Sequence, residues 1–344
     1  MSRRHLENVA YDPNWQPPGV IYGDDLISKV PQTSEKYAVA TMEIPWNLVK
    51  DKLTRQPKKV VFVPNMHKET VEKLETSVPQ VDLVIGIGGG SSHDMAKYIA
   101  LKKQCRLIQI PTILSSDACV TRAVGIRENG KVKYIGHVFI DQIVVDFSLL
   151  KRAPKELIRL GAGDILSSHT ALYDWKVSVR SGFEKMNAHA YKEAKEFLSR
   201  LKKNRYEIRD ATEKGIKTIL ELYLGYARVA NQIGTDRAQE GSEHFFAYGV
   251  EYLTKRHFVH GQLLVTGIAV MSYLQDNDFE ETLELMEDMG IGYRLQKIGL
   301  TKDTFAEVLL SLKEFVEKGG YYYSIVNEKK INSTLIQDVF ERLS

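Results

Sequence analysis

The sequence has few cysteines, no long apolar run and little net charge, and each of these absences excludes a class of protein. Only Cys105 and Cys119 occur among 344 residues, so a framework of several disulfides is excluded by count. No apolar run reaches the roughly 20 residues that a membrane-spanning helix needs. The first residues, Met-Ser-Arg-Arg-His, lack the apolar core of a secretion signal. These features predict a cytoplasmic protein with no membrane partner.

The charge balance argues against nucleic acid as a partner. The 47 basic and 44 acidic side chains leave a formal net charge of +3, which is too even for binding by global attraction. A locally basic site for an anionic metabolite stays compatible with this balance. Hydrophobic residues at 43% and charged residues at 26% are typical of a globular protein, and the length favours two domains over one core.

The first part of the chain predicts an α/β domain with a parallel sheet. Short apolar runs, several of them β-branched, alternate with amphipathic stretches such as Trp46–Leu53 and His67–Val78, which is typical of strands joined by helical crossovers. Asn129-Gly130 predicts the tight turn of a hairpin over Gly125–Gly136, laid on this sheet. The expected strands are Lys36–Thr41, Lys58–Val63, Val81–Ile87, Leu107–Ile110 and Ile143–Val145.

After about Pro154 the apolar residues recur with the spacing of three and four that is typical of helices. The second half is therefore expected to be an all-α domain. We predict domains over residues 1–155 and 156–344, with the boundary between Leu150 and Gly161. The clearest helical patterns are Ala194–Lys203, Glu213–Arg228, Phe279–Met289 and Thr304–Lys318.

A glycine-rich turn follows the expected strand at Val81–Ile87. Glycines at a strand end, followed by a helix, let a phosphate approach the unpaired amides and the positive end of the helix dipole. A tight turn without any ligand also favours glycine, so the spacing alone leaves both interpretations open. The candidate pyrophosphate-binding residues are Gly88, Gly89, Gly90, Ser91, Ser92 and Asp94.

A second cluster of hydroxyl and carboxyl side chains follows the strand that ends near Ile110. Side chains at the carboxyl ends of parallel strands line the crevice where ligands bind, although serine, threonine and aspartate also serve simply as helix caps. The candidates there are Thr112, Ser115, Asp117 and Thr121.

Five motifs in this order resemble the glycerol dehydrogenase and glycerol-1-phosphate dehydrogenase branch of the iron-containing alcohol dehydrogenase superfamily. The resemblance implies an NAD(P)-binding α/β domain followed by an all-α metal-binding domain. It also implies that the aspartate of the third motif opens a helix ending in Asp174-Trp175. The motifs are Gly88 to Lys97, Pro111 to Asp117, Gly161 to Asp164, Gly241 to His244 and His260 to Gln262.

By this resemblance Asp164, His244 and His260 are catalytic residues that bind a divalent metal, either zinc or iron. One carboxylate and two imidazoles leave coordination positions open for a substrate oxygen. Considered singly, each histidine is better explained as a hydrogen-bonded or solvated side chain than as a ligand, and the family order of all three reverses that preference.

The resemblance also assigns the cofactor and the substrate. Gly88 to Asp94 would hold the pyrophosphate of NAD or NADP, with Thr112, Ser115 and Thr121 on the rest of the cofactor. Asp117, which the branch uses as a catalytic and substrate-contacting residue, has capping as its alternative role. Glu43, after the early strand, is a candidate for the ribose hydroxyls.

Two positions depart from the branch. Gln262 stands where a glutamate is usual, and Tyr248 replaces a substrate histidine one helical turn after His244. Tyrosine can donate a hydrogen bond to a substrate but is no cation for phosphate. Glu240 adds an acidic group nearby, and His257 is either exposed or a proton relay.

The sequence therefore predicts a metal-dependent NAD(P) oxidoreductase that interconverts a small polyol and its ketone. Glycerol-1-phosphate with dihydroxyacetone phosphate is the first substrate pair, and glycerol with dihydroxyacetone the second. The alternatives are a lyase similar to dehydroquinate synthases, which uses NAD transiently, and a binding protein without catalysis. The metal, the choice between NAD and NADP, and assembly into a homo-oligomer stay open.

Overall fold

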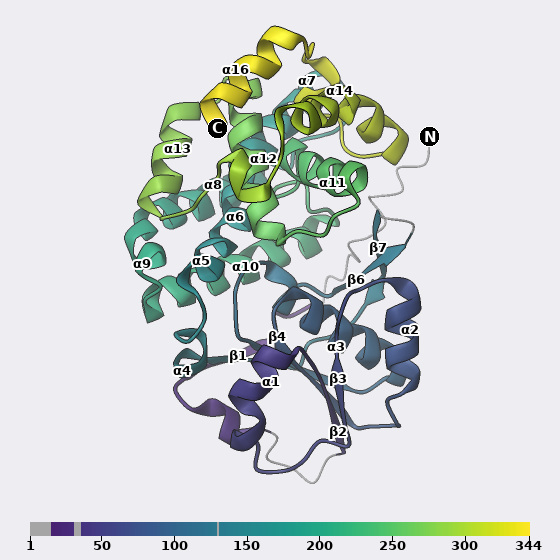
Figure 1. Ribbon diagram of the computed structural model, residues 1–344. Coiled ribbons are helices and arrows are strands. Elements are labelled where there is room, and N and C mark those ends of the chain that lie inside the picture. The colour runs from purple at the N-terminus through teal and green to yellow at the C-terminus, as the bar shows by residue number, and fades with distance from the viewer. Residues whose placement is uncertain (1–14, 31–35, 129–130) are drawn as a thin grey trace. The chain divides into compact units, whose positions relative to one another are not determined.

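The computed structural model describes residues 15–30, 36–128 and 131–344 (Figure 1). The described chain divides into two compact units, residues 16–158 and residues 159–344 together with Trp15, and each is described by itself. The turn predicted at Asn129-Gly130 lies outside the described residues.

The first unit is built on a six-stranded parallel sheet of strand order β1-β8-β5-β4-β2-β3, which confirms the expected α/β class. Strands β2 and β4 in the middle of the sheet are buried along their whole length, because helices cover a parallel sheet on both faces. The strands are β1 (Gly19–Gly23), β2 (Tyr37–Thr41), β3 (Lys59–Phe62), β4 (Leu83–Gly88), β5 (Arg106–Pro111) and β8 (Gln142–Asp146).

Strand β1 has no counterpart among the predicted strands. Within the described part of the chain it is an edge strand that pairs only with β8, and its five residues begin and end with glycine. Glycine is depleted in strands, so a short segment of this composition gives little strand signal. Pairing with β8, far along the chain, supplies what the local sequence lacks.

Helices connect these strands. The crossovers expected before β3 and β4 are present as helical segments. The elements are η1 (Leu26–Lys29), α1 (Glu43–Val49), η2 (Lys50–Lys52), α2 (Lys68–Thr76), α3 (Gly90–Lys103), η3 (Asp117–Cys119), α4 (Phe147–Leu150) and α5 (Lys155–Arg159).

The hairpin strands form a separate two-stranded sheet rather than lying directly on the parallel sheet as expected. β6 (Ala123–Glu128) and β7 (Lys131–His137) are antiparallel, and β6 packs against α3 and α2. The Asp94 carboxylate on α3 accepts a hydrogen bond from the Gly125 amide. The Arg127 amide donates to the Met66 carbonyl just before α2, at 2.8 Å. These bonds hold the hairpin on the helices.

The second unit is helical, as its periodicity predicts. α12 is apolar on nearly every side and is buried among α6, α7, α11, α13 and α16 (Figure 1). No helix in the described part of the chain combines the length and apolarity needed to cross a membrane. The elements are α6 (Gly161–Leu166), α7 (Ser168–Arg180), α8 (Ala188–Lys203), α9 (Arg205–Asp210), α10 (Glu213–Ile233), α11 (Ser242–Thr254), α12 (His260–Gln275), α13 (Phe279–Asp288), η4 (Leu295–Ile298), α14 (Lys302–Gly319), α15 (Ile325–Glu328) and α16 (Ser333–Leu343).

Candidate metal centre and cofactor turn

Glycines let three helices of the second unit approach one another closely. A Cβ on Gly163 of α6 would lie 2.8 Å from Val265 Cγ1 on α12, and one on Gly267 of α12 would lie 2.6 Å from the Glu243 carbonyl oxygen on α11. Real Cβ atoms do not make contacts this short, so both positions depend on the missing side chain. The close packing brings together the three helices that carry Asp164, His244 and His260.

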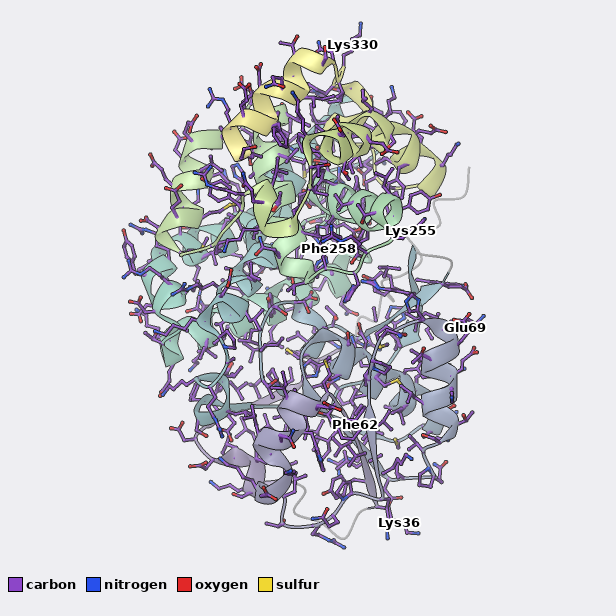
Figure 2. The ribbon with its side chains drawn as sticks, viewed as in Figure 1. Lys36, Phe62, Glu69, Lys255, Phe258 and Lys330 are labelled. Carbon is purple, nitrogen blue, oxygen red and sulfur yellow. The ribbon has the colours of Figure 1, made fainter. Side chains whose placement is uncertain are left out.

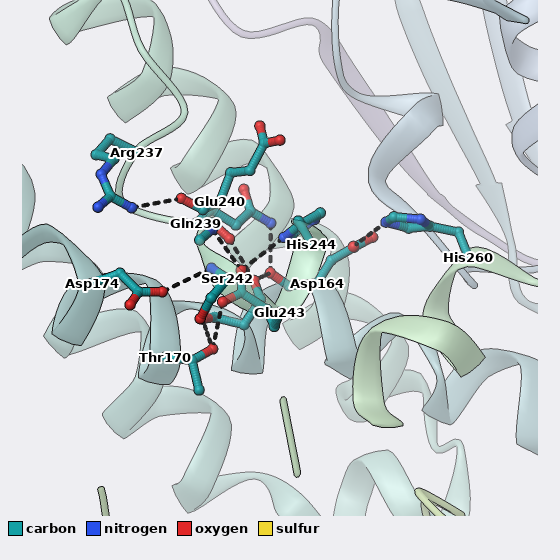
Figure 3. A network of polar contacts seen from close by, with 12 residues as sticks. Asp164, Thr170, Asp174, Arg237, Gln239, Glu240, Ser242, Glu243, His244 and His260 are labelled. Atoms are coloured by element: carbon teal, nitrogen blue, oxygen red, sulfur yellow. Dashed lines mark hydrogen bonds and ion pairs between the residues drawn. The ribbon is translucent and has the colours of Figure 1, made fainter. Parts of the chain in front are cut away.

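These three side chains form one cluster (Figure 3). One ligand atom from each of Asp164, His244 and His260 lies within 4.8 Å of the others. His260 Nε2 is 3.2 Å from Asp164 Oδ1, and the two imidazole centroids are 5.5 Å apart. Asp164 and His244 are buried, whereas His260 is partly exposed. One carboxylate and two imidazoles fit a divalent ion and leave positions open for a small ligand.

Asp164 lies within a short helix, and the expectation that it opens a helix ending in Asp174-Trp175 was wrong. α6 begins at Gly161, and after Ser167 the chain continues as α7, in which Asp174 and Trp175 lie near the middle. The Asp164 carbonyl accepts hydrogen bonds from Ser167 Oγ and Gln239 Nε2, both at 2.7 Å. Gln239 thereby ties the segment before α11 to α6.

Glu243 orients the first histidine, and this role was not predicted from the sequence. Its Oε1 lies 2.8 Å from His244 Nδ1, so Nδ1 carries the proton and Nε2 is left as the ligand atom. Glu243 also accepts hydrogen bonds from the Gly241 amide at 2.7 Å and from Thr170 Oγ1 at 2.7 Å. A glutamate directly before a candidate ligand histidine, in Gly-Ser-Glu-His, was the available signal.

Asp174 fixes the start of α11. Its Oδ2 accepts from the Ser242 amide at 2.8 Å and its Oδ1 from the Ile325 amide at 2.9 Å. Burial raises the pKa of Asp174 to about 6 because the desolvated carboxylate is disfavoured. A Cβ on Gly241 would lie 2.8 Å from Asp174 Oδ2, so glycine at this position lets the carboxylate reach the helix terminus.

The residues around His260 differ in role. His257 is exposed and pairs with Glu251 at 3.2 Å, in the segment that Figure 2 shows leading from Lys255 past Phe258 into α12. Gln262, where the branch usually has glutamate, donates from Nε2 to the Gly292 carbonyl at 2.5 Å. A carboxylate cannot make this bond because it has no donor, so glutamine here stabilises the loop after α13.

Tyr248 lies next to the cluster. Its ring centroid is 6.0 Å from that of His244 and 5.9 Å from the stacked ring of Tyr321. Its hydroxyl is hydrogen-bonded to the carboxyl group of Glu240. The structure therefore brings two further sequence candidates, Tyr248 and Glu240, to the same region as the histidines.

In the first unit the glycine turn joins β4 to α3 as expected. Gly88 ends β4 with a φ of +149°, and a Cβ there would collide with the Ser92 hydroxyl. Gly89 caps α3, and a Cβ on Gly89 would lie 2.6 Å from Ile113 Cδ1. The buried Ser92 hydroxyl has no hydrogen-bond partner within the described residues. A helix N-terminus with side-chain-free backbone in front of it fits a phosphate.

Two hydrogen bonds between His93 and Gln109 link the start of α3 to β5 next to this turn. His93 Nδ1 is 2.6 Å from Gln109 Oε1, and Gln109 Nε2 donates to the His93 carbonyl at 3.2 Å. The Gln109 side chain crosses Gly86, where a Cβ would collide with it. Burial lowers the pKa of His93 to about 4, so the imidazole is neutral at physiological pH.

The second candidate loop lies beside the glycine turn. Gly88 of β4 pairs with Pro111 of β5, and the Thr112 amide donates to the Gly88 carbonyl at 2.9 Å. Thr112 and Ser115 are buried. Asp117 is the first residue of η3, after the capping residue Ser116, so it does not occupy the cap position itself.

Three other cofactor candidates lie outside the glycine turn: Asp94 and Thr121 contact Lys97, and Glu43 begins α1. The Asp94 carboxylate is 2.7 Å from Lys97 Nζ, and the same Nζ donates to the Thr121 carbonyl at 3.2 Å. Asp94 therefore supports the hairpin and the loop before it. Glu43 is exposed at the start of α1, which follows the carboxyl end of β2.

Comparisons with known proteins bear on this arrangement. Residues 32–154 match the family described as iron-containing alcohol dehydrogenase. The chain is similar to the iron-containing alcohol dehydrogenases. This similarity confirms the predicted resemblance and the fold class.

Individual proteins are similar to this chain over most of its length. The glycerol-1-phosphate dehydrogenase [NAD(P)+] of Pyrobaculum arsenaticum is 27% identical over 300 residues, which covers 85% of this chain and 88% of that protein. A probable glycerol dehydrogenase from Sinorhizobium meliloti has a TM-score of 0.72 at 18% identity, covering 95% of this chain and 96% of that one. The glycerol dehydrogenase of Schizosaccharomyces pombe has a TM-score of 0.71 at 19% identity, with coverage of 98% and 91%.

Proposed function

We propose that the protein is a metal-dependent NAD(P) oxidoreductase that interconverts a small polyol and its ketone. The observation that carries the proposal is the convergence of Asp164, His244 and His260, from three different helices, within 4.8 Å of one another. A divalent zinc or iron ion bound there would act as a Lewis acid on a hydroxyl or carbonyl oxygen. The names of the relatives, which are polyol dehydrogenases, support the same reaction.

The residues around the three ligands prepare them for this task. Glu243 holds the proton of His244 on Nδ1, so that Nε2 is available. Asp174 fixes the terminus of α11, and Gln239 fixes the backbone of Asp164. Preorganised ligands lower the cost of holding a substrate oxygen in one orientation. Asp117, at the carboxyl end of β5, is proposed to contact the substrate.

The glycine turn is proposed to bind the pyrophosphate of NAD or NADP. Its support is the α3 N-terminus preceded by Gly88, Gly89 and Gly90, which offers amides to an anion. Ser91, Ser92, Asp94, Thr112, Ser115 and Thr121 complete the proposed cofactor residues. We further propose that residues 1–155 form the cofactor domain and residues 156–344 the metal domain. The proposed location of the protein is the cytoplasm.

Two substrate pairs fit this chemistry. The first pair is glycerol-1-phosphate with dihydroxyacetone phosphate, and it is supported by sequence relatives named glycerol-1-phosphate dehydrogenases. The second pair is glycerol with dihydroxyacetone, and it is supported by structural relatives named glycerol dehydrogenases. Net turnover of NAD(P)H distinguishes either pair from a lyase of the dehydroquinate synthase kind, which regenerates its cofactor in each cycle.

The test combines metal content with turnover. Metal-loaded protein is expected to bind about one divalent ion and to oxidise NAD(P)H with dihydroxyacetone or its phosphate. His244→Ala is expected to lose both bound metal and turnover. His257→Ala is the matched control, because His257 is an exposed histidine that lies against Glu251 rather than in the three-residue cluster. Equal metal content in the two variants, or no oxidation with either ketone, contradicts the proposal.

A further inference from the structure

Tyrosine rings lie on the α11 side of the three proposed ligands. Tyr248 follows His244 by one helical turn. Tyr321, in the segment between α14 and α15, stacks on Tyr248, and its centroid is also 5.4 Å from that of Phe315. Tyr248 and Tyr321 are both partly exposed. A substrate group on this side of the ligands would therefore meet the rings and hydroxyl of an aromatic stack.

A pair of carboxyl groups holds Tyr248 in place. The Tyr248 hydroxyl donates to Glu240, which is itself hydrogen-bonded to Asp236. Tyr322 donates from its hydroxyl to Asp236 Oδ1 at 2.8 Å. Burial and the neighbouring Asp236 raise the pKa of Glu240 well above its ordinary value. Two carboxyl groups can hydrogen-bond to each other only if one of them carries a proton, so the bonded pair keeps one negative charge.

The guanidinium nearest in sequence does not cancel this charge. Arg237 is fully buried, and its Nε lies 3.0 Å from Glu184 Oε2. Its two amino groups donate to the carbonyl oxygens of Glu240 and Tyr323, each at 3.0 Å. Arg237 thus forms its ion pair with Glu184, and its hydrogen bond to Glu240 goes to the main-chain carbonyl rather than to the carboxyl group beside Tyr248.

We propose that Tyr248, held by the Glu240–Asp236 pair, makes the α11 side of the site selective for an uncharged hydroxyl or carbonyl group. The enzyme then uses dihydroxyacetone in preference to dihydroxyacetone phosphate. This inference rests on the proposed function and reverses the order of its two substrate pairs. A tyrosine hydroxyl pairs well with a substrate hydroxyl, whereas a phosphate dianion is repelled by a nearby carboxylate.

A basic segment offers the competing arrangement. Lys255, Arg256 and His257 are exposed just before α12, and the Arg256 guanidinium lies 4.7 Å from the centre of the Phe258 ring. If a substrate phosphate bound there, the charge beside Tyr248 would not decide the preference. The Lys255→Ala/Arg256→Ala variant separates the two arrangements.

The first measurement compares kcat/KM of the metal-loaded wild-type enzyme for the two ketones with NAD(P)H. We expect the value for dihydroxyacetone to exceed that for its phosphate by about tenfold or more, the effect of one unfavourable charge contact. An equal or higher value for the phosphate overturns the inference while leaving the proposed function standing. Absence of turnover with both ketones overturns the proposed function, and the inference with it.

Two variants of the Asp236–Glu240 pair test whether its negative charge causes the preference for dihydroxyacetone. Asp236→Asn/Glu240→Gln removes the negative charge and is expected to shift the ratio of kcat/KM values toward the phosphate by about tenfold. Glu240→Gln alone leaves the Asp236 carboxylate in place, so one negative charge remains and the ratio should move by less than about threefold. Thermal unfolding confirms that both variants fold. Equal shifts in the two variants, or loss of phosphate turnover in Lys255→Ala/Arg256→Ala, contradict the assignment.

Discussion

Gly267 of α12 lies against the backbone of Glu243, the residue before a proposed metal ligand, and Gly267→Ala tests whether this contact builds the site. The added Cβ would lie 2.6 Å from the Glu243 carbonyl oxygen and 3.3 Å from its Cα. A backbone atom cannot rotate away as a side-chain end can. Alanine at this position therefore has to push α11 and α12 apart, and with them His244 and His260.

The stability lost in Gly267→Ala follows from two opposing contributions to the free energy of unfolding. Forcing a methyl group into a packed core costs about 1–3 kcal/mol, while alanine returns about 1 kcal/mol of helix propensity. The net loss is therefore up to about 2 kcal/mol, which lowers Tm by roughly 4–8 °C in a unit of this size. Displacement of the two histidines should also weaken metal binding on the order of tenfold.

The measurement is thermal unfolding with and without zinc, together with a zinc titration. Gly249→Ala in α11 is the matched control, because the nearest atom to its Cβ would be Leu312 Cδ1 at 3.1 Å, the end of a flexible side chain. The control is expected to keep its Tm and zinc affinity. If Gly267→Ala has the same Tm and zinc affinity as the control, close packing of α11 and α12 does not position the ligands.

Three further outcomes follow from single contacts. Glu243→Gln should lower zinc affinity by about 10–100-fold in a titration, because the carboxylate no longer fixes His244; unchanged affinity would contradict this. Buried neutral His93, with its pKa of about 4, lowers the free energy of unfolding by about 3 kcal/mol as pH falls from about 6.5 to 4, since only the unfolded state is protonated there. In urea unfolding, the free energy of unfolding of His93→Gln, which keeps a donor for Gln109, should depend less on pH than that of the wild type. An unchanged pH dependence would show that His93 is not its cause. Gln262→Glu should lower Tm because a carboxylate then faces the Gly292 carbonyl, at a cost of about 1–3 kcal/mol; a Tm equal to that of the wild type would refute this reason.

The sequence was sufficient where a local pattern and the structure coincide. The glycine turn, the buried strands β2 and β4 and the long helices of the second unit follow from periodicity and turn composition. Ordered motifs, rather than periodicity, drew attention to Asp164, His244 and His260. The structure brings these three together, whereas their binding of a metal stays a prediction.

Contacts between distant segments could not be predicted from the sequence. Glu243 meets Thr170, which is 73 positions away, and Asp174 meets Ile325 across 151 positions. The Gly-Ser-Glu-His motif offered a signal for Glu243, but nothing near either acidic residue in the sequence indicates its distant partner. The edge strand β1 was missed for the same reason, because its partner β8 lies more than a hundred residues further along the chain.

The three hydrogen bonds accepted by Glu243 have a thermodynamic consequence for the second unit. One carboxylate connects α7, the start of α11 and the imidazole of His244, so the framework that holds the helices together also presents the ligand nitrogen. An ion that binds only this folded arrangement stabilises it by mass action, in proportion to the logarithm of its free concentration. Chelators should therefore lower the resistance of residues 159–344 to heat and proteolysis as well as removing activity.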